Sequence, residues 1–194
     1  MFRQVDERIL NISATILLLV VFVLNAQPSA YWRDSAELIL SSAYLDIPHP
    51  AGFPLYNLLG NIFSLIPIGP IALRINIMSS VATACLLPLS YLIVREILPS
   101  SKKNPILTIS IIGSGILTCL PIVRQSGTAE VYALNCTLIL TLLFIGLRYI
   151  NSNDIRYGLA ATFLGALTLT NHLASIFVII PCAVLLYLYR PIKQ

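Results

Sequence analysis

Ionisable side chains gather in one segment of a chain that is otherwise strongly apolar. Residues 31–37 (YWRDSAE) supply Arg33, Asp34 and Glu37, and His49 follows between two prolines. An ionisable group close to hydrocarbon is costly, so such a cluster indicates a functional site. Carboxylates in such a site are suited to accepting a proton, and an arginine is suited to holding a phosphate. A solvated loop is the alternative interpretation.

The composition indicates which elements must position these residues. Of the 194 residues, 57% are hydrophobic and 10% are charged, and the mean hydropathy is +0.87. A soluble globular domain carries about 25% charged residues, so we expect an integral membrane protein. Runs of about 20 apolar residues cross a bilayer as helices. We therefore predict an all-α, polytopic transmembrane helical bundle.

Six apolar runs are candidate spans. They cover residues 9–26, 71–94, 106–123, 133–150, 157–171 and 173–189. The last two are short and abut at Asn171 and His172, so a single broken helical hairpin is the alternative. Residues 55–66 are too few to span the bilayer and end at Pro67, which favours a re-entrant or interfacial helix.

We expect the whole chain, residues 1–194, to form a single transmembrane module. The first span would occupy residues 1–30, an external catalytic loop with interfacial helices residues 31–70, and the remaining spans residues 71–194. The first apolar run is long for a signal peptide, which favours a retained anchor over a cleaved signal. The four cysteines lie in apolar spans without metal-ligand spacing, so we expect small core residues.

The distribution of Lys and Arg predicts the orientation of the chain, because cytoplasmic loops accumulate these residues. With the N-terminus inside, the cytoplasmic basic residues are Arg3, Arg8, Arg95, Lys102, Lys103, Arg148, Arg156, Arg190 and Lys193. Only Arg33, Arg74 and Arg124 are then external. The same topology brings Asp34, Glu37, Asp46, His49, Glu130 and His172 to the external or lumenal face. The net charge of +4 therefore reflects orientation and not nucleic-acid binding.

An amphipathic helix is expected at the start of the external loop. Ser29 is a candidate cap for a helix that runs to about Tyr44. Its apolar stripe would consist of Ala36, Ile39, Leu40 and Ala43, with Asp34, Glu37 and Ser41 on another face. Two carboxylates one turn apart can raise one pKa, which suits a proton acceptor, whereas Arg33 or a metal ion would hold both ionised. A solvated amphipathic helix is the plainer alternative.

Three prolines stiffen the second half of this loop. Pro48, Pro50 and Pro54 disfavour helix before them, and Gly52 is free to take a positive φ. His49 is therefore positioned either as a ligand or proton carrier, or as a residue that only packs at the interface.

Further polar residues lie at the predicted external ends of later spans. Arg74 opens the second span, and Arg124 precedes Glu130 in a short loop. Each arginine can snorkel, pair with a carboxylate or bind a phosphate. Asn171 and His172 are candidates for the same surface, and helix–helix hydrogen bonding is the alternative.

Five short motifs carry a resemblance to a known family. In chain order they are Arg33-Asp-Ser-Ala-Glu-Leu, Ile47-Pro-His-Pro-Ala-Gly-Phe-Pro-Leu-Tyr56, Arg74-Ile-Asn76, Glu130-Val-Tyr-Ala-Leu-Asn135 and Leu169-Thr-Asn-His-Leu173. Together they resemble the ordered signature of the protein O-mannosyltransferase-like membrane family, within the GT-C glycosyltransferase superfamily. Members of that family are generally longer, so the resemblance implies an N-terminal portion, or a short member, of an enzyme whose other half is a partner.

The resemblance implies a GT-C type glycosyltransferase. Such an enzyme moves a sugar, typically mannose, from a polyprenyl- or dolichyl-phosphate sugar to a protein or glycan acceptor, with inversion. It implies catalytic roles for Asp34, as general base, and for Glu37. The substrate- and phosphate-binding residues would be Arg33, His49, Arg74, Arg124, Glu130, Asn171 and His172. The enzyme would lie in the plasma membrane of a prokaryote or in the endoplasmic reticulum of a eukaryote.

Other functions stay open from the residues alone. A lipid or solute carrier also gathers charge at broken helices, although near the bilayer midplane. A non-catalytic membrane subunit would use the carboxylates only to pair with arginines. No residue is assigned as a metal ligand, but a divalent metal ion stays open as a cofactor.

Overall fold

A computed structural model describes residues 6–98 and 104–188, and every regular element in these ranges is helical. The elements are α1 Glu7–Leu24, α2 Ser35–Tyr44, α3 Pro54–Ser64, α4 Ile71–Ala84, α5 Leu86–Ile97, α6 Pro105–Thr118, α7 Leu120–Gln125, α8 Val131–Ser152, α9 Ile155–Asn171, the 3₁₀ turn η2 Leu173–Ser175 and α10 Ile176–Leu188. The predicted all-α class is confirmed.

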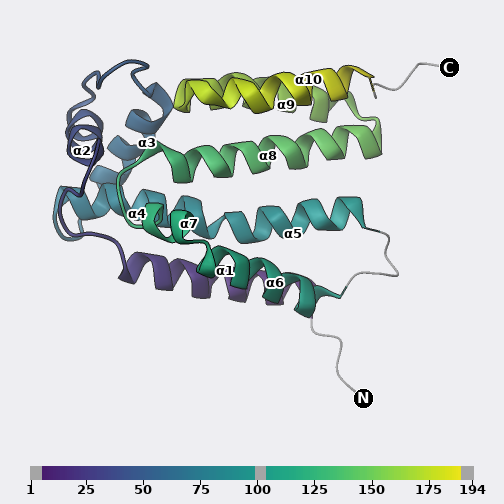
Figure 1. Ribbon diagram of the computed structural model, residues 1–194, viewed down its shortest axis with the longest axis horizontal. Coiled ribbons are helices and arrows are strands. Elements are labelled where there is room, and N and C mark those ends of the chain that lie inside the picture. Colours follow the sequence, from purple (N-terminus) through teal and green to yellow (C-terminus); the bar gives the residue numbers. More distant parts are fainter. Residues whose placement is uncertain (1–5, 99–103, 189–194) are drawn as a thin grey trace.

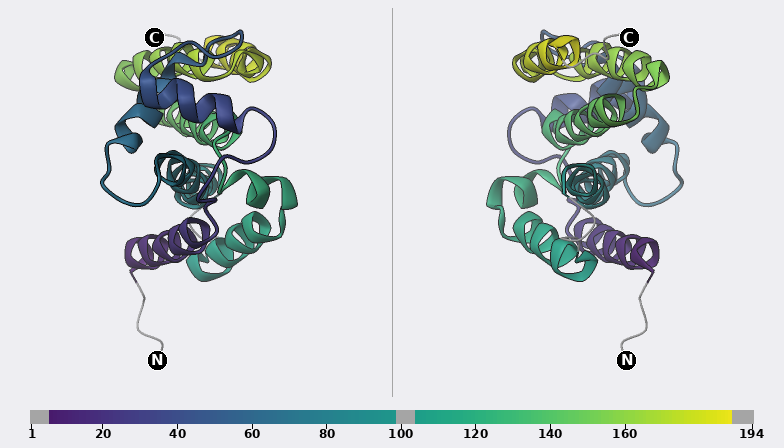
Figure 2. Two further views of the ribbon diagram at one scale, coloured as in Figure 1. Left: turned by 90° about the vertical axis from the view of Figure 1, so that its left-hand side faces the viewer. Right: turned by 90° about the vertical axis from the view of Figure 1, so that its right-hand side faces the viewer.

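The long helices lie side by side and the short helices α2 and α3 cover one end of the bundle (Figure 1). Seen end-on, α1 and α6 lie on one side, α9 and α10 on the other, with α5 and α8 between them (Figure 2). Helix α8 packs against α4, α5, α9 and α10. Helix α8 is therefore in contact with helices from both halves of the chain.

Three helices are long and apolar enough to cross a membrane. They are Glu7–Leu24, the combined α4–α5 helix Ile71–Ile97, and Val131–Ser152, which match the predicted runs 9–26, 71–94 and 133–150. The other predicted runs are also helical, but α6 has 14 residues, α9 has 17 and Leu173–Leu188 is a shorter apolar helix. Six spans therefore stay a prediction.

Proline explains two interruptions. Pro121 has no N–H to donate to the carbonyl of Leu117, and the predicted run 106–123 is split at Cys119, whose backbone is extended. Pro88 cannot donate to the carbonyl of Ala84, and the combined helix has a turn at Cys85 between α4 and α5.

Some sequence-based predictions fall outside the described residues. These are the last residue of the sixth run, Tyr189, and five of the basic residues in the charge count: Arg3, Lys102, Lys103, Arg190 and Lys193. The described ends of α1, α5 and α8, which carry Arg8, Arg95 and Arg148, lie at the end of the bundle opposite α2 and α3 (Figure 1).

Helix α2 ends where predicted, at Tyr44, but begins at Ser35 after Asp34, not after Ser29. The predicted apolar stripe is also wrong, since Leu40 is 60% exposed. The buried face is instead Ser35, Leu38, Ile39, Ser41 and Ser42. Small serines are buried because α2 packs closely on α3, whose polar side chains satisfy their hydroxyls.

The amide of Asn57, on α3, joins α2 to the proline-rich loop. Its Oδ1 accepts hydrogen bonds from Ser41 and Ser42 at 3.1 and 3.3 Å. Its Nδ2 donates to the carbonyls of Asp46 and Gly52 at 3.1 and 3.3 Å. Buried backbone carbonyls need such partners, so Asn57 fixes the loop that carries His49 against α2.

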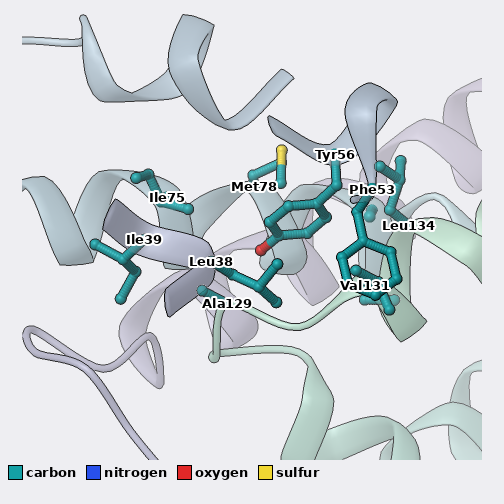
Figure 3. Close-up of a cluster of buried hydrophobic side chains, with 11 residues drawn as sticks. Leu38, Ile39, Phe53, Tyr56, Ile75, Met78, Ala129, Val131 and Leu134 are labelled. Atoms are coloured by element: carbon teal, nitrogen blue, oxygen red, sulfur yellow. The ribbon is translucent and has the colours of Figure 1, made fainter. Parts of the chain in front are cut away.

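Apolar side chains from distant segments pack beneath this loop (Figure 3). Leu38 from α2, Phe53 from the loop just before α3, Tyr56 from α3 and Val131 from α8 belong to one buried cluster that also includes Ala129. The cluster anchors the covered end of the bundle. None of the four cysteines is buried or paired, and Cys136 is exposed, so their prediction as core residues is wrong.

Gly127 lies where the segment before α8 passes the end of α1. A Cβ at Gly127 would come within 2.7 Å of the Asn25 carbonyl oxygen, a backbone atom that cannot rotate away. Gly127→Ala should therefore lower the free energy of unfolding by about 1–3 kcal/mol, seen as a lower Tm in detergent. The control is Gly115→Ala in α6, where nothing lies within 4 Å. Equal Tm values for both variants would contradict this packing.

Candidate functional site

Four of the predicted site residues line one cavity at the covered end of the bundle. This cavity, the carboxylate pocket, has a volume of about 300 Å³. Its lining includes Asp34, His49, Phe53, Glu130, Tyr132 and His172. The chain thus brings together residues from the start of α2, the proline-rich loop, the start of α8 and the end of α9. Nearly 140 residues separate the first of them from the last in sequence.

Glu37 does not line the carboxylate pocket, but it makes two contacts with His49, which does. Its Oε1 accepts a hydrogen bond from the His49 backbone N–H at 2.6 Å, and its Oε2 lies 2.8 Å from His49 Nδ1. The hydrogen bond from the His49 side chain lowers the pKa of Glu37, and the same bond raises the pKa of His49. Both side chains are exposed to solvent, so the pair mainly fixes where the imidazole lies.

Glu130 has the least exposed carboxylate in the pocket. It precedes α8 as its N-cap and is only 3% exposed, and its Oε1 has no hydrogen-bond partner. Burial, together with the nearby Asp34, raises the pKa of Glu130 to about 6, whereas Arg33 and the Asp34 backbone N–H act in the opposite direction. A carboxylate with such a pKa is suited to gaining and losing a proton near neutral pH.

His172 closes the far side of the pocket with an aromatic group. Its ring stacks on Phe53 at 6.3 Å between centroids and lies 5.5 Å from Tyr132. Its Nδ1 is buried without a partner. The extended backbone of His172 ends α9 and separates it from η2, so the two predicted C-terminal runs are separate helices.

Asn171 is fully buried and does not line the carboxylate pocket. Its Nδ2 donates to the Val131 carbonyl at 3.2 Å and lies 3.4 Å from Asn135 Oδ1. Asn171 therefore ties the end of α9 to the start of α8, which is the helix–helix alternative that the sequence left open.

A second cavity of about 410 Å³, the arginine pocket, adjoins the first through Glu130. Its lining also includes Tyr31, Trp32, Arg33 and Arg124. Arg33 has a φ of 66°, a left-handed conformation that is strained for a residue with a side chain. The two predicted phosphate-binding arginines on this side of the bundle therefore meet at one cavity.

A third cavity of about 330 Å³, the apolar groove, adjoins the arginine pocket through Arg33 and Gln125. Its remaining lining comes mainly from α5, α7 and α8 and includes Leu86, Pro121 and Ile122. Its walls are almost entirely apolar, so it is suited to a hydrocarbon chain.

Arg74 lines none of these three cavities. Its guanidinium donates to the carbonyls of Ser64, Ile68 and Gly69 at distances of 2.8–3.1 Å. Arg74 thus holds the connection between α3 and α4, and the structure does not bring it to the other predicted site residues. Backbone carbonyls compete with a phosphate for the same planar fork, and sequence spacing does not reveal which is bound.

Sequence reasoning did not assign Phe53 or Tyr132 to the pocket. Both are aromatic residues within the motifs of the sequence, Phe53 next to Gly52 and Tyr132 next to Val131. Phe53 has a φ of 41° and its ring also lies edge-on to His49, 5.1 Å between centroids. An unusual backbone conformation of this kind has no signal in the sequence.

Another cavity, of about 750 Å³, lies at the opposite end of the bundle. Its lining includes Arg8, Arg95 and Arg148. Arg95 pairs with Glu7, and Arg148 pairs with Glu96 at 3.0 Å. It contains none of the predicted site residues.

Comparison with known proteins agrees with the motifs. The profile of a family described as the protein O-mannosyl-transferase TMEM260 N-terminal domain matches residues 34–194. A mouse (Mus musculus) protein O-mannosyl-transferase TMEM260 is 28% identical over 179 residues, 90% of this chain and 25% of that protein. A Dictyostelium discoideum protein O-mannosyl-transferase tmem260 is 28% identical over 182 residues, 84% of this chain and 21% of that protein. No solved structure matches the chain.

The Glu37–His49 pair should give stability that depends on pH. Because the pKa of His49 is raised, its contribution is present below the ordinary value of 6.5 and fades as the pH rises through the folded pKa. Because the pKa of Glu37 is lowered, its contribution is present above the ordinary value of 4.5 and fades below it. The Tm difference between wild type and Glu37→Gln should therefore be largest between about pH 4.5 and 6.5. Asp46→Asn is the control, and a difference that does not vary with pH would count against the pair.

Proposed function

Because this chain belongs to the family of the protein O-mannosyl-transferase TMEM260 N-terminal domain, we propose that it is the part of a membrane glycosyltransferase that activates the acceptor hydroxyl and holds the donor phosphate. The sugar would be mannose, by likeness to relatives that carry the name protein O-mannosyl-transferase. The chain spans about a quarter of the length of these relatives. The proposal therefore concerns what its own residues contribute to the reaction.

The continuity of the three cavities is the observation that carries this proposal. The apolar groove shares Arg33 with the arginine pocket and Tyr132 with the carboxylate pocket, and the arginine pocket shares Glu130 with the carboxylate pocket. A lipid-linked sugar has one part for each of these adjoining cavities: a hydrocarbon tail, a phosphate and a sugar that meets the acceptor. We assign the tail to the groove, the phosphate to the arginines and the reacting hydroxyl to the carboxylates.

The chemistry would be a single displacement at the anomeric carbon. The acceptor oxygen forms a bond to that carbon while the bond to the phosphate oxygen breaks, so the configuration inverts. Asp34 takes the hydroxyl proton as general base, and Glu130 is the second carboxylate within the pocket. Arg33 and Arg124 stabilise the charge that develops on the departing lipid phosphate.

The pairing expected of a non-catalytic subunit is not observed. Such a subunit would use its carboxylates to neutralise the nearby arginines, but among residues 6–98 and 104–188 no ion pair joins Arg33 or Arg124 to Asp34 or Glu130. The charged groups instead face cavities, which leaves them available to substrates.

The location of the site at one end of the bundle supports a reaction at a membrane surface. A carrier would place its site near the bilayer midplane. We further propose a multi-pass GT-C arrangement with the N-terminus in the cytoplasm and the carboxylate pocket on the external or lumenal face.

Thiol labelling tests this topology. In a variant without the native cysteines, Ile47→Cys lies in the loop at the covered end, where Ile47 is 85% exposed. Ser152→Cys lies at the opposite end, where α8 finishes. A membrane-impermeant maleimide applied from the external or lumenal side should label the first variant and not the second. The reverse pattern would contradict the topology, and with it the proposed face of the reaction.

Replacement of the proposed base should abolish transfer without unfolding the protein. General-base catalysis contributes about 10²–10⁴-fold, so Asp34→Asn should lower the turnover by at least about 10²-fold. Arg124→Gln should also slow transfer, because it removes charge stabilisation of the leaving phosphate. Transfer from polyprenyl-phosphate sugars to peptides would be followed in liposomes by mass spectrometry.

Arg156→Gln is the matched control, since Arg156 pairs only locally with Asp154 at the other end of the bundle. Unchanged transfer by folded Asp34→Asn would remove the assignment of the base. Transfer that does not require a lipid-linked donor would remove the proposed function.

A further inference from the structure

Three side chains in and beside the carboxylate pocket are arranged as a possible ligand set. Asp34, Glu37 and His49 each offer one ligand atom, and these atoms all lie within 4.8 Å of one another. Two of them come from the first turn of α2 and the third from the proline-rich loop. Carboxylate oxygen and imidazole nitrogen together are donors that first-row divalent metals accept.

A helix dipole alone does not explain this arrangement. Acidic residues are favourable at a helix N-terminus, which accounts for Asp34 and Glu37. It does not account for His49, whose loop is held in place by Asn57 and Glu37. The dipole of α2 also does not account for the carboxylate of Glu130, which does not belong to α2.

Glu130 supplies an independent indication of a missing cation. It lines the same pocket as Asp34 and His49, it is 97% buried, and its Oε1 has no hydrogen-bond partner. A buried carboxylate oxygen without a partner is costly. A cation beside the pocket would offset the repulsion between Asp34 and Glu130, which Arg33 and His49 offset only in part.

We propose that Asp34, Glu37 and His49 bind one divalent first-row metal ion, of the Zn²⁺ or Mn²⁺ type, beside the carboxylate pocket. Glu37 Oε2 and His49 Nδ1 already lie 2.8 Å apart. Only the farthest ligand atom would have to approach, since two ligands bound at about 2.0–2.2 Å lie at most about 4.4 Å from each other. Metal binding is measured without substrate, so it is tested separately from the proposed transfer reaction.

Direct binding measurements test the site. The purified protein in detergent, treated with EDTA and then desalted, would be titrated with Mn²⁺, and free Mn²⁺ would be followed by EPR. Competition with Zn²⁺ would use the same signal. We expect one Mn²⁺ per chain, displaced by Zn²⁺. Asp34→Asn and His49→Gln should each weaken binding at least tenfold.

Asp34→Asn is the cleaner variant, because the Asp34 side chain makes no capping hydrogen bond and the helix start should persist. Asp46→Asn is the matched control, an exposed acid in the same loop that binds only the adjacent Ile47 N–H. Circular dichroism and Tm would show that each variant is folded. Wild-type protein that binds neither ion at 1:1 stoichiometry, or equal weakening by Asp46→Asn, would overturn the proposal.

Discussion

The site depends on the need to satisfy backbone carbonyls where loops meet an apolar bundle. Asn57 is 6% exposed, and its amide serves two carbonyls of the proline-rich loop and two serines of α2 at once. Asn76 does the same for the connection between α1 and α2, donating to the carbonyls of Gln27 and Ser29. Arg74 does so for the connection after α3. Without these side chains the loops would lack partners, and His49 would not be held beside Glu37.

Much of this arrangement was predictable, because membrane helices and their polar interruptions are local signals. Hydropathy located the helices, and the predicted runs 9–26, 71–94 and 133–150 match the three that are long enough to span. The charge distribution brought Asp34, His49, Glu130 and His172 to one end, and the structure places all four around one pocket. Helix α3 lies where the short run 55–66 predicted an interfacial helix.

The buried face of α2, the role of Arg74 and the start of α2 could not be predicted, because each depends on contacts with residues distant in sequence. The buried face of α2 is determined by its contact with Asn57 and Gly60 of α3. A Cβ on Gly60 would lie only 2.5 Å from Ser42 Oγ. The periodicity of the α2 sequence does not predict that contact. The sequence is equally consistent with Arg74 binding a phosphate and with Arg74 binding the carbonyls of a loop, and only its carbonyl partners in the structure distinguish the two. The start of α2 was misplaced because Ser29 and Asp34 both resemble caps, and the Asn76 contact holds the chain at Ser29 outside a helix.

The position of Glu130 between two cavities has a thermodynamic consequence. One carboxylate borders both the arginine pocket and the carboxylate pocket. An anion entering the first therefore favours protonation of Glu130, and by reciprocity protonation of Glu130 strengthens the hold on that anion. A cation in the second has the opposite influence. Binding in one pocket therefore changes the binding affinity of the other, because both affinities depend on whether Glu130 is protonated. This coupling requires no movement of the helices.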